Sequence, residues 1–476
     1  MDLTALDRLG PLEETPRGWS TEHVIVRDAG CTSAFAVDKS THAVGIGGAL
    51  WPFRLRAPSW RDDPLGAAMK LTVAAFAAVL MLAGGVRAAG LSPADQSAIT
   101  AIETRLTPAS ANVAPNTETL AARMAELKVP GVSIAFIEGG KVKWVRAYGV
   151  ATAGASQPVG PDTLFQAASM SKAFAAAAAL KLVDQGRLDL DGDINSRLKA
   201  WKVPDSPYTA QQKITLRRLL SHTAGLTVGG FPGYPAGKPV PTILQILDGA
   251  PPSNTPAIRS FETPGGNYAY SGGGYVVAQL AIVEAGGKPY PELLDQLVLR
   301  PVGMRRSTFA QPLPEALVGH AASGHDRKGD VIPGGRNTYP EYAAASLWTT
   351  PSDYGQFYIS LQDAYAARPH ALLSPAGAKA MMTPIDANYG LGVAIGRWGG
   401  HAFIQHGGGN AGFQCNAFAF LDGARQGVVV MTNSDAGGAL AQEITISLAK
   451  AYGWGEQDPA TRGSSRRAPY SPPAAK

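Results

Sequence analysis

Two groups of strand-forming segments lie far apart in this 476-residue chain, and their separation constrains the fold more than any other feature. Short runs with strand-like patterns, bounded by turn residues, cover residues 129–137, 141–149, 389–397, 402–405, 412–421 and 427–432. The region between the two groups, about 163–340, contains helical patterns and loops rich in Gly and Pro. We therefore expect a mixed α/β fold of the α+β type. An antiparallel sheet flanked by helices would be built from both chain ends, with a mainly helical insert at about 163–340.

Helical patterns flank the strand segments on both sides. Ser92 and Pro93 form a helix start, because a serine caps the first turn and the missing N–H of proline costs nothing there. This helix is predicted to run to about Leu106. Further helices are predicted over about 116–127 and about 440–452.

The N-terminal region has the sequence pattern of an export signal. Met69 and Lys70 precede a 12-residue apolar stretch at 71–82, and small residues around Arg87 form a cleavage pattern typical of signal peptides. The stretch is shorter than the about 18–20 apolar residues of a membrane span. We expect a signal peptide at 69–88 and translation from Met69. Residues 1–68, which show no sustained period, would then be a non-native upstream extension or a disordered leader. The alternative is a cytoplasmic segment ahead of a weak membrane anchor.

These boundaries leave a globular domain at 89–456. We expect it to be exported, either to the periplasm or into the medium, with no stable membrane span after signal cleavage. Residues 457–476 are rich in Pro, Ser, Arg and Ala and are predicted to be a disordered tail. The oligomeric state stays open at this point.

Composition excludes several classes of function. The chain has two cysteines, Cys31 and Cys415, and no Cys-x-x-Cys pair. Its eight histidines form no His-x-His or His-Glu-x-x-His motif, so no metal site is predicted. The net charge of +5 includes no long run of like charges, so we expect no nucleic-acid partner. A small-molecule substrate is the remaining expectation.

A Ser-x-x-Lys motif at Ser169 and Lys172 is the first candidate for chemistry. Residues three apart on a helix share a face, so the lysine amine reaches the serine hydroxyl. The motif also occurs at Ser196 and at Ser447, but Ser196 lies in a polar segment and Ser447 inside the final helix. Only Ser169 opens a long apolar helix, where free N–H groups and the helix field favour a nucleophile. Desolvation by that helix favours the neutral amine that a base requires.

Two further segments supply partners for this pair. Tyr270 lies in a Tyr-Ser-Gly sequence, and a phenol beside an ammonium group can act as acid or base. His406 precedes three glycines, which let a strand backbone approach a ligand and present N–H groups to an oxyanion. We predict catalytic roles for Ser169, Lys172, Tyr270 and His406. The predicted substrate-binding residues are Ser271, Gly272, Gly407 and Gly408.

The order of these motifs resembles the serine β-lactamase and penicillin-binding superfamily. Within it, the chain is similar to the branch of class C β-lactamases, D-alanyl-D-alanine carboxypeptidases and family VIII carboxylesterases. Supporting segments lie at 219–226, 343–353, 389–392 and 428–433, and the similarity runs from about 120 to 452. The resemblance implies the fold expected above.

The resemblance also implies roles for individual residues. Ser169 would be the nucleophile, Lys172 its activating base, and Tyr270 would move protons to or from the reacting groups. The backbone N–H groups of Ser169 and Gly409 would form the oxyanion hole. An acyl-enzyme would form and be hydrolysed by water, without a metal or organic cofactor.

Two departures from the family pattern bear on the substrate. Gly272 stands where the branch often has Asn, and His406-Gly407-Gly408 stands where a Lys-Thr-Gly motif holds the substrate carboxylate. Histidine carries only a partial charge near neutral pH, and glycine has no hydroxyl. We therefore predict an exported serine hydrolase, an esterase or peptidase acting on a small ester, amide or peptide.

Three alternatives are weighed against this prediction. The first is a class C-like β-lactamase or D-Ala-D-Ala carboxypeptidase. The second is a non-catalytic penicillin-recognising protein, against which the intact Ser169, Lys172 and Tyr270 argue. The third is an α/β-hydrolase lipase, which is disfavoured because the chain contains no Gly-x-Ser-x-Gly sequence.

Overall fold

The computed structural model describes residues 22–28, 31–38, 43–48, 51–54, 91–108 and 118–458, in two compact units that divide after Gly90. In the first unit, four antiparallel strands form a sheet in sequential order: β1 (Glu22–Asp28), β2 (Cys31–Asp38), β3 (Ala43–Gly48) and β4 (Trp51–Arg54). No strands were predicted there from the sequence. The predicted signal peptide at 69–88 lies outside the described residues.

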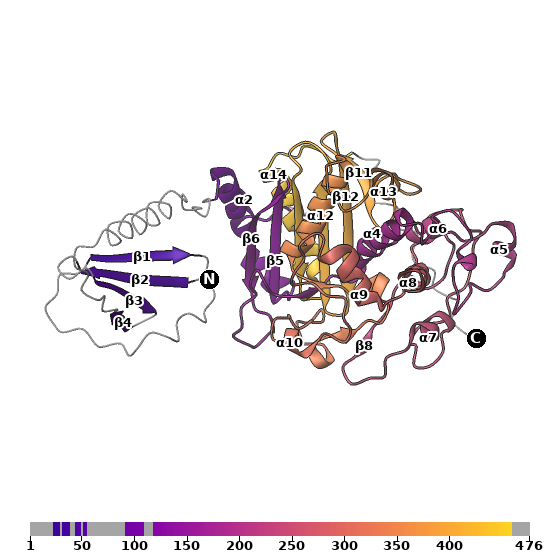
Figure 1. Ribbon diagram of the computed structural model, residues 1–476, viewed down its shortest axis with the longest axis horizontal. Coiled ribbons are helices and arrows are strands. Elements are labelled where there is room, and N and C mark those ends of the chain that lie inside the picture. Colours follow the sequence, from indigo (N-terminus) through magenta and orange to yellow (C-terminus); the bar gives the residue numbers. More distant parts are fainter. Residues whose placement is uncertain are drawn as a thin grey trace, which may run out of the picture. The chain divides into compact units, whose positions relative to one another are not determined.

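A six-stranded antiparallel sheet organises the second unit, as Figure 1 shows. Its strands are β5 (Gly131–Glu138), β6 (Lys141–Gly149), β11 (Ala394–Trp398), β12 (His401–Asn410), β13 (Phe413–Phe420) and β14 (Gly427–Thr432). They are ordered β11-β12-β13-β14-β5-β6, so the pairing of β14 with β5 joins the two sequence-distant groups. The predicted antiparallel sheet built from both chain ends is confirmed.

The boundaries of two predicted strands were wrong. The strand predicted at 389–397 begins only at Ala394, and the strand predicted at 402–405 continues to Asn410. Glycines give no apolar pattern, yet the backbone of Gly407 and Gly409 pairs with β13 opposite Asn416 and Gln414. The pairing of β11 with β12 ends at Gln405. On the side away from β13, residues 406–410 therefore have no pairing with β11.

Helices cover both faces of the sheet. One face packs against α2 (Pro93–Thr104), α3 (Leu120–Glu126) and α14 (Gly437–Ala451), and the other packs against α12 (Pro351–Tyr365). The start of α2 has the predicted cap: the Ser92 hydroxyl accepts from the Asp95 N–H, while the Asp95 carboxylate accepts from the Ser92 N–H. The sheet thus separates two apolar cores.

The segment between β6 and β11 is mainly helical, as predicted for the insert. Its helices besides α12 are η2 (Ala168–Met170), α4 (Ser171–Asp184), η3 (Ile194–Ser196), α5 (Pro207–Gln211), α6 (Leu216–Leu220), α7 (Ile243–Asp248), α8 (Gly272–Gly286), α9 (Tyr290–Leu294), η4 (Asp295–Leu299), α10 (Glu315–Val318), η5 (Pro333–Gly335), α11 (Tyr342–Ala345) and α13 (Pro375–Met381). Two short strand pairs lie among them: β7 (Phe165–Gln166) with β10 (Trp348–Thr349), and β8 (Tyr234–Pro235) with β9 (Asn337–Thr338).

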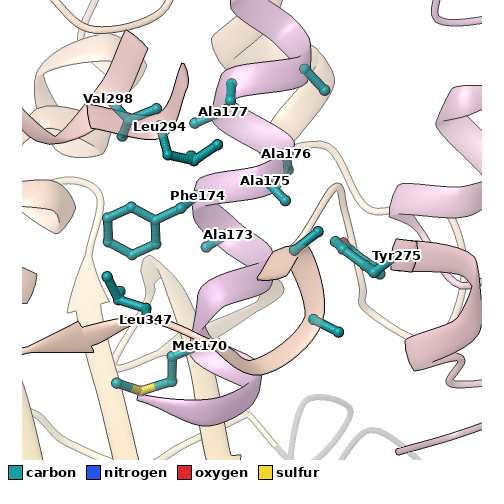
Figure 2. Close-up of a cluster of buried hydrophobic side chains, with 14 of the residues drawn as sticks. Met170, Ala173, Phe174, Ala175, Ala176, Ala177, Tyr275, Leu294, Val298 and Leu347 are labelled. Atoms are coloured by element: carbon teal, nitrogen blue, oxygen red, sulfur yellow. The ribbon is translucent and has the colours of Figure 1, made fainter. Parts of the chain in front are cut away.

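Helix α4 is the centre of this region. Figure 2 shows Phe174 on the side that carries Leu294 and Leu347, while Tyr275 lies on the other side of the helix. The run of buried alanines lets α8 and α11 pack closely against α4, because small side chains reduce the distance between helix backbones. The N-terminal turn of α4 is therefore held in place by a closely packed core. Among the described helices, none is long and apolar enough to cross a membrane.

Candidate active site

Ser169 lies in the single turn η2, directly before α4. Ala168 adopts a left-handed backbone conformation with φ of 49°, which is strained for a residue with a Cβ. Lys172 follows on the first turn of α4 and is only 1% exposed. Its Nζ donates to the Ser169 Oγ at 3.0 Å and to the carbonyl oxygen of Ala344 at 2.9 Å. The pair predicted from sequence is thus in direct contact.

Tyr270 lies next to this pair. Lys172 Nζ is 5.0 Å from the centre of the Tyr270 ring and 5.5 Å from that of Tyr275. These distances fall within the range of cation–π attraction. Tyr270 and Ser169 line the same cavity. Three of the predicted catalytic residues are therefore brought together.

The glycines of β12 allow the strand to lie directly against η2. A Cβ at Gly408 would lie 2.2 Å from the carbonyl oxygen of Ala167 and 3.2 Å from the Cβ of Ala168. Only glycine permits this approach without a backbone shift. The approach brings Gly409 to the cavity that Ser169 lines.

His406 lines the same cavity, and both of its ring nitrogens are engaged within the protein. Nδ1 lies 2.6 Å from the carbonyl oxygen of Gly407, and Nε2 lies 3.0 Å from the hydroxyl of Tyr389. A carbonyl oxygen only accepts, so Nδ1 carries a proton and donates to Gly407. Two contacts therefore fix the orientation of the His406 ring.

Sequence reasoning missed His222, which touches the predicted site. Its ring centre is 4.2 Å from that of Tyr270, and Nδ1 accepts from the N–H of Ser271 at 3.0 Å. Nε2 is buried and has no hydrogen-bond partner among the described residues. Burial first, and then the charges of Lys172 and His406, hold the pKa of His222 well below its ordinary value of 6.5. His222 is therefore an uncharged side chain that packs against Tyr270 at the site.

Tyr389 was missed in the same way. Its ring lies 5.0 Å from His222 and 5.4 Å from Tyr268, and its hydroxyl contacts His406. Burial raises its pKa well above 10, so its hydroxyl keeps its proton. Both residues lie in segments that support the resemblance, at 219–226 and 389–392, and this was the only available signal.

The cavity in front of Ser169 has a volume of about 720 Å³. Besides the residues named above, it is lined by Gly229, Gly230, Trp398, Gln405, Gly407, Gln414, Cys415, Asn416, Phe418, Gly438, Ala441, Gln442, Thr445, Ile446 and Gln457. This space is large enough for a small substrate. In the described part of the chain, no cluster of three His, Cys, Asp or Glu residues could hold a metal ion.

Comparison with known proteins decides the family. The Beta-lactamase family profile matches residues 116–452, which is most of the chain. The chain belongs to the Beta-lactamase family. The resemblance found in the sequence, and the fold that it implied, are confirmed.

Two curated proteins with different names are similar to this chain. Esterase EstB of Burkholderia gladioli is 32% identical over 206 residues, which is 40% of this chain and 50% of EstB. Protein flp of Staphylococcus aureus strain N315 is 28% identical over 236 residues, 48% of this chain and 42% of flp. The chain thus matches half or less of the length of these curated relatives.

Solved structures support the Beta-lactamase family fold. The octameric penicillin-binding protein homologue from Pyrococcus abyssi gives a TM-score of 0.57 at 23% identity, covering 71% of this chain and 76% of that chain. D-amino acid amidase from Ochrobactrum anthropi SV3 gives a TM-score of 0.57 at 23% identity, covering 76% and 99%.

The structure gives Ser271 and Gly272 a different place from the one predicted. The Ser271 hydroxyl accepts from the N–H of Gly274 and donates to the carbonyl of Thr227, so it caps α8. A Cβ at Gly272 would lie 2.8 Å from the ring of Phe231, so a larger side chain does not fit there without a shift of that ring. Neither residue lines the cavity formed by the described residues, whereas Gly407 and Gly408 do.

The other two Ser-x-x-Lys motifs use their serines elsewhere. The Ser196 hydroxyl donates to the carbonyl of Asp193 at 2.7 Å, and the Ser447 hydroxyl accepts from the N–H of Thr107 at 2.7 Å. Ser447 is also 3% exposed, inside α14. These contacts agree with the choice of Ser169 from sequence context.

Proposed function

We propose that this chain is an exported serine hydrolase that forms an acyl-enzyme on Ser169 and acts on small esters or amides. The contact of 3.0 Å between Lys172 Nζ and Ser169 Oγ, at the wall of the cavity, carries this proposal. A buried amine beside a hydroxyl is the arrangement that activates a serine without a histidine base. Membership of the Beta-lactamase family supports an enzymatic role.

The proposed reaction has two halves. Ser169 Oγ attacks the substrate carbonyl carbon while Lys172 or Tyr270, acting as the base, takes its proton. The N–H groups of Ser169 and Gly409 would stabilise the negative oxygen of the tetrahedral intermediate. Tyr270 would pass this proton to the leaving group as its bond to the carbonyl carbon breaks. Water then attacks the acyl carbonyl carbon and gives a proton to Tyr270. The bond to Ser169 Oγ breaks, the acid leaves, and Tyr270 returns the proton to Ser169.

The cavity favours an uncharged substrate. Among the described residues that line it, there is no Lys, Arg, Asp or Glu. His406 has both nitrogens engaged, and Gly407 lacks a hydroxyl, so the usual carboxylate contacts of a β-lactam are weakened. An esterase, amidase or peptidase is therefore proposed over a β-lactamase. The names of the similar EstB and D-amino acid amidase agree with this choice.

A substrate panel on the purified protein tests the proposal. We expect hydrolysis of short p-nitrophenyl esters, with slow turnover of nitrocefin and of D-Ala-D-Ala peptides. Ser169→Ala should abolish the ester hydrolysis, and the control Ser196→Ala should retain it. Turnover of nitrocefin well above that of the esters would replace this proposal with a β-lactamase. Ester hydrolysis that persists in Ser169→Ala would refute the proposed nucleophile.

Export is a separate part of the proposal and rests on the sequence pattern at 69–88. Mass spectrometry of the N-terminus of the native exported protein tests it. We expect the first residue to lie shortly after 88. Peptides from residues 1–68 in the exported protein would contradict it.

A further inference from the structure

The cavity at Ser169 continues around the edge of β12 to the opposite face of the sheet. Ser169 lies on the η2 side, where Gly408 touches Ala167. The cross-strand pairs Gly409–Gln414, Gly407–Asn416 and Gln405–Phe418 put these residues on the other face, because side chains alternate along a strand. That face packs against α14, and residues from both faces line the one cavity. The two parts of the cavity connect along the edge of β12 beyond Gln405, where β11 no longer pairs with it.

Small residues keep the far part of the cavity open. A Cβ at Gly407 would meet only the carbonyl of Cys415, at 3.7 Å. A Cβ at Gly438, in the first turn of α14, would meet only Gln414 Oε1, at 3.6 Å. Ala441 follows one helical turn later on α14. Elsewhere on this face, aromatic side chains such as Phe403 and Phe420 fill the space between sheet and helix.

The far part of the cavity is lined mainly by neutral hydrogen-bonding groups, and we call it the amide groove. Its residues are Gln405, Gln414, Asn416, Gly438, Gln442 and Thr445, with Trp398 and Phe418 at one end. The Trp398 indole N–H donates to the carbonyl of Gly455, and its ring meets Phe418 edge-on at 5.5 Å. The groove therefore offers amide partners along its length and a fixed apolar end.

We propose that the amide groove binds the part of the substrate beyond the bond cleaved at Ser169, and that this part is an uncharged, peptide-like chain. The proposal rests on the serine hydrolase function proposed above and names its substrate class. Secondary amides match the donors and acceptors of Gln405, Gln414 and Asn416. A free carboxylate would be desolvated without a cation to receive it. From Gly409 to Gln405 the strand spans about 13 Å, at about 3.3 Å per residue, which suits about three to four peptide units.

Two matched substitutions on α14 test the groove. Gly438→Leu places a side chain in the groove without a backbone clash, and leucine also favours the helix. Ala439→Leu adds the same side chain one residue later, at an exposed position outside the cavity lining. Thermal unfolding confirms that each variant folds. If Gly438→Leu does not melt cooperatively, Gln442→Trp on the exposed side of the same helix replaces it as the blocking variant.

The readout is the ratio of kcat/KM for an extended substrate to that for a short one. The short substrate is p-nitrophenyl acetate, and the extended one is the p-nitrophenyl ester of N-acetyl-glycyl-glycine. In a second series the acyl group is acetate in both substrates, and the extended substrate carries the same neutral diamide on the alcohol side of the ester. We expect a wild-type ratio of about tenfold or more in one of the two series, since pocket contacts discriminate by about 10–200-fold. Gly438→Leu should reduce that ratio about tenfold, and Ala439→Leu should keep it.

Each outcome has a separate meaning. Loss of the ratio in the acyl series or in the alcohol series supports the groove and assigns the side of the substrate that it binds. A ratio that Gly438→Leu leaves unchanged in both series overturns the groove while the proposed hydrolase stands. If the wild type shows no hydrolysis that depends on Ser169, the proposed function fails instead.

Discussion

Gly408 offers a sharp test of how the fold positions Ser169. In Gly408→Ala the new Cβ would start 2.2 Å from the carbonyl oxygen of Ala167, and contacts under 3.0 Å are essentially never seen. The two segments must therefore move apart by at least about 0.8 Å. Because Ala167 is two residues before Ser169, the shift falls on the turn that carries the nucleophile.

Two effects follow from this displacement. A misplacement of about 1 Å at a reacting group costs about 100-fold in rate, so kcat should fall by about that factor. The crowding between β12 and η2 should also lower the free energy of unfolding by about 1–3 kcal/mol. The first effect is measured with a short p-nitrophenyl ester, and the second by urea unfolding.

The neighbouring glycine provides the control for stability. A Cβ at Gly407 would meet only the carbonyl of Cys415, at 3.7 Å, so Gly407→Ala should change the free energy of unfolding by less than about 0.5 kcal/mol. If Gly408→Ala matched Gly407→Ala in stability and kept the wild-type kcat, the close contact between β12 and η2 would not position Ser169.

Three further predictions concern buried titratable residues. Lys172→Met should lower kcat about 100-fold or more on esters, because the base is lost. Below pH 6.5 only the unfolded state protonates His222, so the free energy of unfolding of the wild type should fall by about 1.4 kcal/mol per pH unit. His222→Asn should remove this dependence. Asparagine suits the left-handed backbone at this position, where φ is 60°. Burial raises the pKa of Glu341 to about 8, so unfolding releases its proton between pH 4.5 and 8 and stability falls as pH rises. Glu341→Gln should remove that fall. Urea unfolding at several pH values checks both, with His370→Asn, at an exposed position that has the same φ of 60°, as the matched control.

The sequence predicted the parts of the fold that side-chain patterns encode. Residues 131–138 and 427–432 alternate or form β-rich runs, and their pairing followed from the positions of the two groups. The extension of β12 through Gly409 was not predictable in this way. Glycines show no pattern, and this segment is a strand because its backbone pairs with β13 and packs against Ala167.

In the candidate site, too, local contacts were predictable from the sequence and long-range contacts were not. Ser169 and Lys172 lie one helical turn apart, so local spacing predicted their contact. His222 reaches the site through the N–H of Ser271, 49 residues later in the chain, and the Ala344 carbonyl reaches Lys172 from 172 residues away. Such contacts depend on tertiary packing. No local sequence pattern predicts these contacts.

Covalent labelling tests the central claim, that Ser169 is the nucleophile, most directly. The wild-type protein is treated with a fluorophosphonate probe, digested and mapped by mass spectrometry. We predict one adduct per chain, on Ser169, lost in Ser169→Ala and retained at full stoichiometry in Ser196→Ala. An adduct on another serine, or equal labelling of Ser169→Ala, would contradict the account.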